Sequence, residues 1–362
     1  MTAISEHGSN AASRPVPVAG QPLDMHGLAW IHLGHAAFQH LNAACELNLF
    51  EFVADHGTVT KAEVAEGLGL RERATDILLL GVSSLGLLTV SDGKYRLAAV
   101  LDEFLRTDDW QRFKDIVAFE QHIVYEGQHD FTESLRTNSN AGLRRIPGTG
   151  RDLYHRLNEN PRLERVFYRY MRAWSELSNR QMVEALDLSG ARRLLDVGGG
   201  DAVNALALAQ ANPHLAVTVL DIDETVPITE AKIAEAGLAD RVDVRALDIL
   251  HEEFPTGYDV VLFAHQLVIW TLEENTALLR KAYDVLPEGG KVVIFNSMSN
   301  DAGDGPTVAG LLSVYFATLP AEGGMIYSWA QHEQCLADAG FRDFQRIPLS
   351  GWTPRGVLVA VK

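Results

Sequence analysis

A run of three glycines is the part of this chain best suited to hold a ligand. The run consists of Gly198, Gly199 and Gly200. It follows the apolar stretch 194–197, which contains Asp196 and predicts a buried strand, and it precedes a helix predicted over 203–210. Glycine lets a backbone approach a ligand where a Cβ would collide, and the helix start offers free N–H groups. The next predicted strand ends at Asp221, a carboxylate placed to accept hydrogen bonds from ribose hydroxyls. These residues predict a nucleoside at the carboxyl edge of a parallel sheet.

The details of the glycine turn bear on which nucleoside is expected. A dinucleotide-binding turn has the pattern G-x-G-x-x-G, but Val203 stands at the third glycine position and no cradle for a pyrophosphate is evident. An NAD-dependent dehydrogenase is therefore an alternative that the pattern opposes. The run from Asp196 to Gly200, followed by a strand that ends in Asp221, instead resembles the S-adenosylmethionine site of class I methyltransferases. The resemblance implies that the turn packs against the methionine part and that Asp221 binds the ribose.

Composition limits the classes of function that are plausible. The chain has 362 residues, 47% of them apolar, which is enough for two domains with a sizeable core. The net charge of −17 opposes a nucleic-acid partner, and no apolar run reaches the ~20 residues of a membrane span. Cys45 and Cys335 each lie in an apolar helical pattern, so we expect two buried thiols rather than a disulfide. Residues 1–22 lack an apolar signal core and predict a disordered tail, and we expect a cytoplasmic protein.

Residues 23–107 predict a small, mainly helical domain of the winged-helix type. A capping box from Thr60 to Glu63 starts one helix, and Asp92-Gly93 predicts the turn of a hairpin. The helix–turn–helix–hairpin order is typical of winged helices. Because the chain is acidic and no basic recognition helix is evident, we interpret this domain as a dimerisation module that makes the protein a homodimer, not as a DNA reader.

Residues 108–189 predict a helical region rich in aromatic side chains. Its aromatic and histidine residues are Trp110, Phe113, Phe119, His122, Tyr125, His129, Phe131, Tyr154, Phe167, Tyr168, Tyr170 and Trp174. Two interpretations stay open: these rings form a helical core, or they line a pocket for a flat substrate.

Residues 190–362 alternate between predicted strands and helices, which indicates a doubly wound α/β sheet. The strands are expected at 193–197, 216–221, 242–246, 259–264, 291–296, 344–348 and 356–361. Only a short segment separates the last two strands, so they should pair antiparallel. A parallel, Rossmann-like sheet that ends in an antiparallel strand is the topology of class I methyltransferases.

From about Met25 to its end, the chain resembles the plant-type O-methyltransferases, the group that includes caffeate and hydroxyindole O-methyltransferases. Besides the glycine turn, the resemblance rests on Met171 and Ser175 in the pattern F-x-x-x-M-x-x-x-S, and on the acid–apolar pair Asp248 and Ile249. Further matches are Trp270 with Glu273-Glu274, Gly289-Gly290-Lys291 and Gly323-Gly324. The resemblance implies that Met171 and Ser175 contact the cofactor and that Asp248 and Ile249 embrace its adenine.

The residues that the family uses for catalysis are all changed in this chain. The family's base is the histidine of a His-Asp-Trp motif, and the aligned residue here is Val268. Asn296 and Trp329 stand where the family has two glutamates. The phenol O-methylation mechanism of the family cannot simply be transferred.

His265 is the replacement base that we expect. It lies three residues before Val268 and directly after the strand predicted at 259–264, where ligands bind in open α/β sheets. A histidine there can titrate near neutral pH and remove a phenolic or enolic proton; the alternative is a core histidine bonded to backbone. Asn296 is expected to orient a substrate oxygen or to cap the strand. The expected substrate-binding residues are His122, Trp174, Tyr315, Glu322, Tyr327 and Trp329.

These features predict an S-adenosylmethionine-dependent methyltransferase for a small aromatic or amino-acid-derived metabolite of secondary metabolism. Ring C-methylation is favoured slightly over O-methylation, and N-methylation also fits. Two further interpretations stay open: a C-methyltransferase of an α-keto acid, and a non-catalytic regulator that binds S-adenosylmethionine. Among His122, His129, His265 and His332 no local metal-ligand spacing is evident, so no metal is expected.

Overall fold

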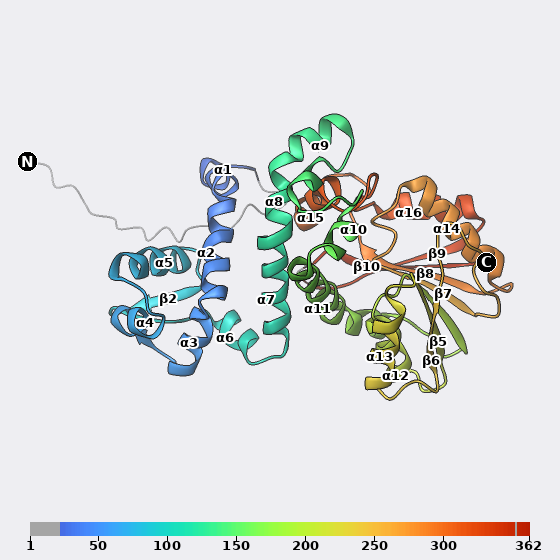
Figure 1. Ribbon diagram of the computed structural model, residues 1–362, viewed down its shortest axis with the longest axis horizontal. Coiled ribbons are helices and arrows are strands. Elements are labelled where there is room, and N and C mark those ends of the chain that lie inside the picture. The colour runs from blue at the N-terminus through green and yellow to red at the C-terminus, as the bar shows by residue number, and fades with distance from the viewer. Residues whose placement is uncertain (1–21, 352) are drawn as a thin grey trace, which may run out of the picture. The chain divides into compact units, whose positions relative to one another are not determined.

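The structure is a computed structural model that describes residues 22–351 and 353–362. The predicted disordered tail therefore lies, except for residue 22, outside the described residues. The chain divides into two compact units between Thr107 and Asp108 (Figure 1). No helix in the described ranges has the length and apolar character needed to cross a membrane.

The first unit consists of short helices and one small sheet. Its elements are α1 (Met25–His32), α2 (Gly34–Glu46), α3 (Leu49–His56), β1 (Val59–Thr60), α4 (Lys61–Gly67), α5 (Glu72–Ser84), β2 (Leu88–Ser91), β3 (Lys94–Leu97) and α6 (Ala99–Leu105). The predicted capping box starts α4: the backbone N–H of Thr60 donates to Glu63 Oε2 at 2.7 Å, and the N–H of Glu63 donates to Thr60 Oγ1 at 3.3 Å. Asp92-Gly93 joins β2 to β3 in the predicted hairpin, and the sheet has the order β1-β3-β2.

The second unit begins with a helical region that carries most of the aromatic residues. Its elements are α7 (Asp109–Phe119), a π-helical turn η1 (Glu120–Val124), α8 (Tyr125–Gly127), a 3-10 turn η2 (Gln128–Asp130), α9 (Phe131–Thr137), a 3-10 turn η3 (Ala141–Arg145), α10 (Leu153–Asn158) and α11 (Pro161–Ala185). Apolar and aromatic side chains from these helices form a core with Tyr315 and Leu319 of α15 (Thr307–Thr318) and its C-terminal end. Both interpretations of the aromatic residues hold in part, because this core also forms one wall of the cavity described below.

The rest of the second unit is a seven-stranded sheet with helices on both faces (Figure 1). The strands are β4 (Arg193–Val197), β5 (Ala216–Asp221), β6 (Val242–Ala246), β7 (Val260–Ala264), β8 (Lys291–Ser297), β9 (Arg342–Pro348) and β10 (Arg355–Val361), in the order β6-β5-β4-β7-β8-β10-β9. The first five are parallel, whereas β10 runs antiparallel to both β8 and β9. The predicted doubly wound sheet with a final antiparallel pair is confirmed.

The two faces of the sheet have separate apolar cores, each covered by its own helices. One core packs against α14 (Leu272–Val285) and α16 (Trp329–Ala339), and the other against α11, α12 (Val203–Ala211) and α13 (Val226–Glu235). Side chains alternate between these faces along each strand. In β8, Ile294 packs in the first core and Phe295 in the second. The face that a strand-end residue occupies therefore decides whether it can reach a given site.

The two cysteines are buried and form no disulfide, as expected: Cys45 and Cys335 are each 4% exposed.

Candidate active site

The predicted glycine turn lies between β4 and α12, and its geometry requires glycine. Gly198 and Gly200 have φ angles of +70° and +57°, a region that other residues rarely adopt. A Cβ on Gly199 would lie 2.5 Å from Asp196 Oδ2 and 2.9 Å from a methyl of Val219. The turn thus exposes bare backbone at the carboxyl edge of the sheet, as a bound nucleoside needs.

Asp221 ends β5 beside this turn and is held by backbone donors. The N–H of Gly200 donates to Asp221 Oδ2 at 2.8 Å, and the N–H of Ile222 donates to Oδ1 at 2.9 Å. A carboxylate accepts about four hydrogen bonds, so both oxygens keep capacity for ribose hydroxyls. Burial raises the pKa of Asp221, and the two N–H donors oppose that rise.

Asp196 lies beneath the turn, not in front of it. Its side chain is completely buried, and neither carboxylate oxygen has a hydrogen-bond partner within the described residues. Burial, and secondarily the charge of Asp221, raises the pKa of Asp196 to about 7. Its position shows it packed under the backbone of Gly199, so any effect on a ligand would pass through the shape of the turn.

The buried carboxyl of Asp196 should make the stability of the cofactor-free protein depend on pH. The pKa of Asp196 is about 7 in the folded protein and about 3.8 in the unfolded chain. The folded protein therefore loses stability as the pH rises from about 4 to 7. We expect Asp196→Asn to raise Tm at pH 8 by about 10 °C, since the rise in pKa from 3.8 to about 7 corresponds to about 4 kcal/mol and each 1 kcal/mol shifts Tm by ~2–4 °C in a domain of this size. At pH 5 the difference should shrink because Asp196 is then protonated. Thermal unfolding at the two pH values checks this; an equal shift at both would contradict it.

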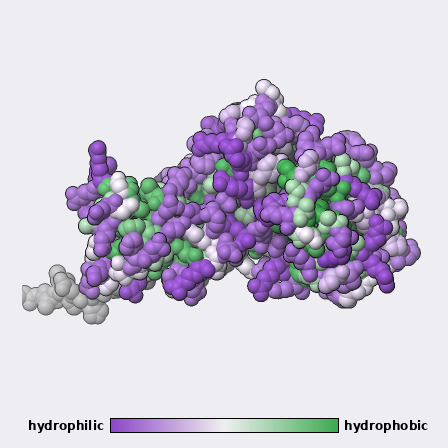
Figure 2. All heavy atoms as spheres, turned by 60° about the horizontal axis from the view of Figure 1, so that its bottom comes forward, coloured by the Kyte–Doolittle hydropathy of each residue, from purple (hydrophilic) through white to green (hydrophobic). Residues whose placement is uncertain are grey.

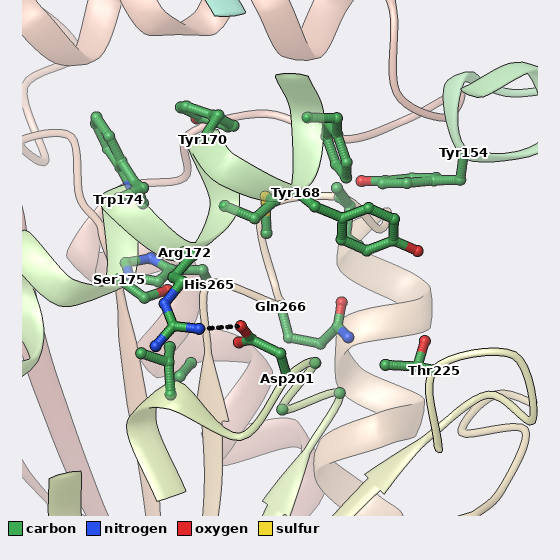
Figure 3. Close-up of a pocket in the computed structure, with 18 of the residues that line it drawn as sticks. Tyr154, Tyr168, Tyr170, Arg172, Trp174, Ser175, Asp201, Thr225, His265 and Gln266 are labelled. Carbon is green, nitrogen blue, oxygen red and sulfur yellow. Dashed lines mark ion pairs between the residues drawn. The ribbon is translucent and has the colours of Figure 1, made fainter. Parts of the chain in front are cut away.

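The glycine turn forms one wall of a cavity of about 300 Å³. The opposite wall is aromatic and comes from Phe119, Tyr154, Phe167, Tyr168, Tyr170, Trp174, Tyr315 and Phe316. Figure 3 shows Tyr154, Tyr168, Tyr170 and Trp174 ranged above His265, Gln266 and Asp201. Nine residues predicted from the sequence line this cavity: Met171, Trp174, Ser175, Gly198, Gly199, Gly200, Asp221, His265 and Tyr315.

The aromatic wall is tightly packed and uncharged. The rings of Phe119 and Tyr170 stack with centroids 3.6 Å apart, and the ring of Tyr315 meets Phe119 edge-on at 5.3 Å. Burial raises the pKa values of Tyr154, Tyr170 and Tyr315 well above the usual 10, so all three hydroxyls stay protonated. A flat, apolar ligand fits such a wall.

His265 is the first residue after β7 and has a left-handed backbone with φ of +57°. Its N–H donates to the carbonyl of Phe295 at 2.7 Å, which fixes the position of the residue. Its imidazole lines the cavity, and Nε2 has no hydrogen-bond partner within the described part of the chain. Burial, followed by the charge of Arg355, lowers its pKa to about 3. This corrects the expectation of titration near neutral pH: the ring stays neutral there, with a nitrogen free to accept a proton.

Asn296 and Trp329 are not among the residues that line the cavity, which opposes the expected substrate contact for each. Alternation along β8 places Asn296 on the face that is covered by α14 and α16, fully buried and without a partner for its amide among the described residues. Its register partner in β10 is Gly356, and a Cβ there would lie 2.2 Å from the ring of Trp329. Trp329 thus fills the space over Gly356 instead of covering a pocket mouth.

Other predicted residues also lie away from this cavity. The hydroxyl of Tyr327 donates to the carbonyls of Trp270 and Gly323 at 2.7 and 2.9 Å, a structural role, while Glu322 is exposed. Asp248 accepts hydrogen bonds from the backbone N–H of Leu250 and from the His251 ring, and so holds its own loop together. His122 and Ile249 are likewise absent from the cavity wall. A match to the family's motifs therefore does not by itself place a residue at this cavity.

The cavity wall also contains polar residues that we did not predict. Gln266 follows His265, and its Nε2 would lie 1.7 Å from a Cβ on Gly198, so its side chain packs on the turn. Arg172 of α11 pairs with Asp201 at 3.8 Å (Figure 3). Glu120 begins the π-helical turn. Gln266 could have been predicted from the sequence because it directly follows His265. Glu120 could not, because a single acidic residue in a predicted helix does not indicate a binding site.

Among the described residues, no group of three His, Cys, Asp or Glu side chains is arranged to hold a metal ion.

Comparison with known families identifies the chain. The model of an O-methyltransferase domain matches residues 129–342, and that of an O-methyltransferase dimerisation domain matches residues 31–107. The chain belongs to the O-methyltransferase family. It is an enzyme of the methyltransferase class that uses S-adenosylmethionine, so the dehydrogenase interpretation is wrong.

Relatives of known activity cover nearly the whole chain. An L-tyrosine C(3)-methyltransferase of Streptomyces lavendulae is 66% identical over 357 residues, 98% of this chain and 97% of that protein. A 3-hydroxy-5-methyl-1-naphthoate 3-O-methyltransferase of Streptomyces sahachiroi is 32% identical and covers 90% of this chain and 91% of its own. The crystal structure of the apo S-adenosylmethionine-dependent methyltransferase SibL is 49% identical, with a TM-score of 0.86 over 94% of this chain and 99% of that one.

Proposed function

We propose that the enzyme methylates a ring carbon next to the hydroxyl of a phenolic amino acid, tyrosine or a close derivative, in the biosynthesis of a secondary metabolite. The observation that carries this proposal is the 66% identity, over 98% of the chain, to an L-tyrosine C(3)-methyltransferase. The cavity supports it, because an aromatic wall faces the glycine turn across a space of about 300 Å³. The naphthoate O-methyltransferase, at 32% identity, makes O-methylation the main competing outcome.

The residues around the glycine turn fit S-adenosylmethionine. In the proposal, Asp221 accepts hydrogen bonds from the ribose hydroxyls, and the bare backbone of Gly198 to Gly200 admits the methionine part. Met171 and Ser175 of α11 line the same cavity and face this donor. The cofactor supplies an electrophilic methyl group bound to a sulfonium.

His265 handles the phenolic proton in this proposal. Removing that proton pushes electron density onto the ring carbon beside the oxygen, which makes the carbon nucleophilic. The neutral imidazole can accept it at the unpartnered Nε2, and the phenolate that forms stabilises the imidazolium in return. The ring carbon then bonds to the methyl carbon as the carbon–sulfur bond breaks. The proton on that ring carbon passes to solvent, which restores the aromatic ring as a phenolate, and the imidazolium of His265 returns its proton to the phenolate oxygen. The apolar Val268, 5% exposed, leaves no base at the position the family uses.

Analysis of the product tests the proposed function. The purified enzyme is incubated with L-tyrosine and S-adenosylmethionine carrying a ¹³C-labelled methyl group, and the product is examined by mass spectrometry and NMR. We expect a methyl group on the ring carbon beside the hydroxyl, seen as loss of one aromatic proton. A methyl group on oxygen would contradict the proposal, and so would turnover of an α-keto acid, or of a phenol that is not an amino acid, without product from tyrosine or its close derivatives.

We also propose that the protein is a cytoplasmic homodimer that forms through its first unit. The match to a dimerisation domain supports this, and α1 offers an apolar surface in which Met25 and Ile31 are 75% and 61% exposed. Most of the face shown in Figure 2 is hydrophilic, but hydrophobic patches are visible on it, one of them on the first unit, at the left of the view. Light scattering of the purified protein would show the mass of two chains.

A further inference from the structure

Glu120 is an acidic side chain in the cavity wall that the proposed reaction leaves without a role. It is the first residue of the π-helical turn η1, directly after Phe119, whose ring stacks on Tyr170. Such turns insert an extra residue into a helix and re-aim the side chains around it, and they occur frequently at functional sites. Here the turn lies where the helical region meets the cavity.

The carboxylate of Glu120 has no partner of its own. Within the described residues, neither an ion pair nor a hydrogen bond to its side chain is present, and burial alone raises its pKa to about 7. Arg172 supplies the positive charge of the cavity wall, but it is engaged with Glu176 at 2.7 Å and with Asp201 at 3.8 Å. Glu120 is only partly exposed, and a carboxylate that is largely removed from water without a cation is costly, so it takes up a proton or receives a cation from outside the protein.

The groups around Glu120 suit an organic cation. Glu120 lines the same cavity as Tyr170 and Tyr315, and after burial its negative charge is one of the causes that raise the pKa values of both tyrosines. Because these hydroxyls stay neutral, their rings add favourable cation–π attraction and no competing charge. The aromatic wall and the acid together form a site for an ammonium group attached to an aromatic ligand.

We propose that Glu120 binds the ammonium group of the amino-acid substrate and so selects phenols that carry an amine over those that do not. This rests on the proposed function and names the part of the substrate that the aromatic end of the cavity recognises. His265 and Glu120 then have separate tasks: one accepts the phenolic proton, and the other holds the amine.

A pair of small phenols tests the assignment. Tyramine and 4-ethylphenol differ only in the amine, and their binding to the full-length enzyme loaded with S-adenosylhomocysteine can be measured by calorimetry. We expect Glu120→Gln to weaken tyramine binding about 100-fold, as for loss of one partner of a buried charge pair, and to change 4-ethylphenol binding less than about 3-fold. The matched control is Glu126→Gln, an exposed acid in α8, which should change neither.

The possible outcomes separate this proposal from the proposed function. Equal weakening of both phenols by Glu120→Gln would overturn the ammonium site. Unchanged binding with lost turnover of 4-ethylphenol would also overturn it and make Glu120 the base. If neither phenol binds the wild-type enzyme, the proposed ammonium site at Glu120 is also contradicted. Glu120-dependent binding of tyramine without ring methylation would uphold the site and overturn only the proposed reaction.

Discussion

Replacement of His265 by alanine is expected to lower kcat for the phenolic substrate by about 10²–10⁴-fold, the usual contribution of a general base. The affinity for S-adenosylmethionine should stay close to normal, because Asp221 and the glycine turn, the groups proposed to bind the ribose and methionine parts, are left intact. If kcat/KM falls as the pH is lowered through 7 to 6, protonation of the His265 imidazole should not be the cause. With a pKa of about 3, the imidazole of the free enzyme is in its proton-accepting form throughout that range.

The backbone of His265 requires a second variant for this test. At φ of +57°, alanine adds strain, whereas asparagine tolerates the left-handed region and cannot act as a base near neutral pH. His265→Asn should therefore lose turnover like His265→Ala but keep the Tm of the wild-type protein more closely. Single-turnover methyl transfer and calorimetry with S-adenosylmethionine measure the two effects. Normal turnover in the asparagine variant would show that His265 is not the base.

Asp221→Ala is expected to weaken the binding of S-adenosylmethionine by about 30–1,000-fold. In the proposed site this change removes the acceptor of the ribose hydroxyls, and a hydrogen bond to a charged group contributes about 1.5–3 kcal/mol net, so we expect a total loss of about 2–4 kcal/mol. It also loses its contact with the N–H of Gly200, which leaves the turn less well ordered. The effect should therefore exceed that of any single contact.

Two control variants make the Asp221 measurement specific. Asp221→Asn keeps the shape and one acceptor oxygen, so we expect an intermediate loss of affinity. Asp223→Ala removes an exposed acid two residues away, outside the cavity wall, and should leave affinity unchanged. Calorimetry with S-adenosylmethionine gives the dissociation constants. Unchanged affinity in Asp221→Ala would rule out the ribose assignment.

The sequence was a good guide wherever local pattern determines structure. The strands of the sheet were predicted to within about two residues, because buried parallel strands are short apolar runs bounded by turns. The glycine turn and Asp221 were found for a similar reason: Gly198 and Gly200 need positive φ angles, and Asp221 is the last residue of its strand.

What could not be predicted depends on packing between distant segments. Asn296 is expected at the site from the sequence, but it lies on the face of β8 that α14 and α16 cover. Because successive residues of a strand point to opposite faces, a difference of one residue decides which face Asn296 occupies. The low pKa of His265 arises from burial that its neighbours in sequence do not reveal. Glu120 enters the cavity from a π-helical turn, which has no recognised sequence signal.

The packing of Trp329 over Gly356 bears on how such an enzyme can change during evolution. The indole ring occupies the space that a Cβ at Gly356 would need, and Asn296 is the register partner of that glycine. Replacing Trp329 alone by the glutamate that the family has there would leave space over Gly356 and remove the ring that Arg346 overlies at 5.9 Å. Reverting Val268 alone would restore a histidine without its acidic supports. We therefore expect the effect of a change at position 329 to depend on the residues at positions 268, 296 and 356, so that these positions have to be exchanged together to regain the family's catalytic set.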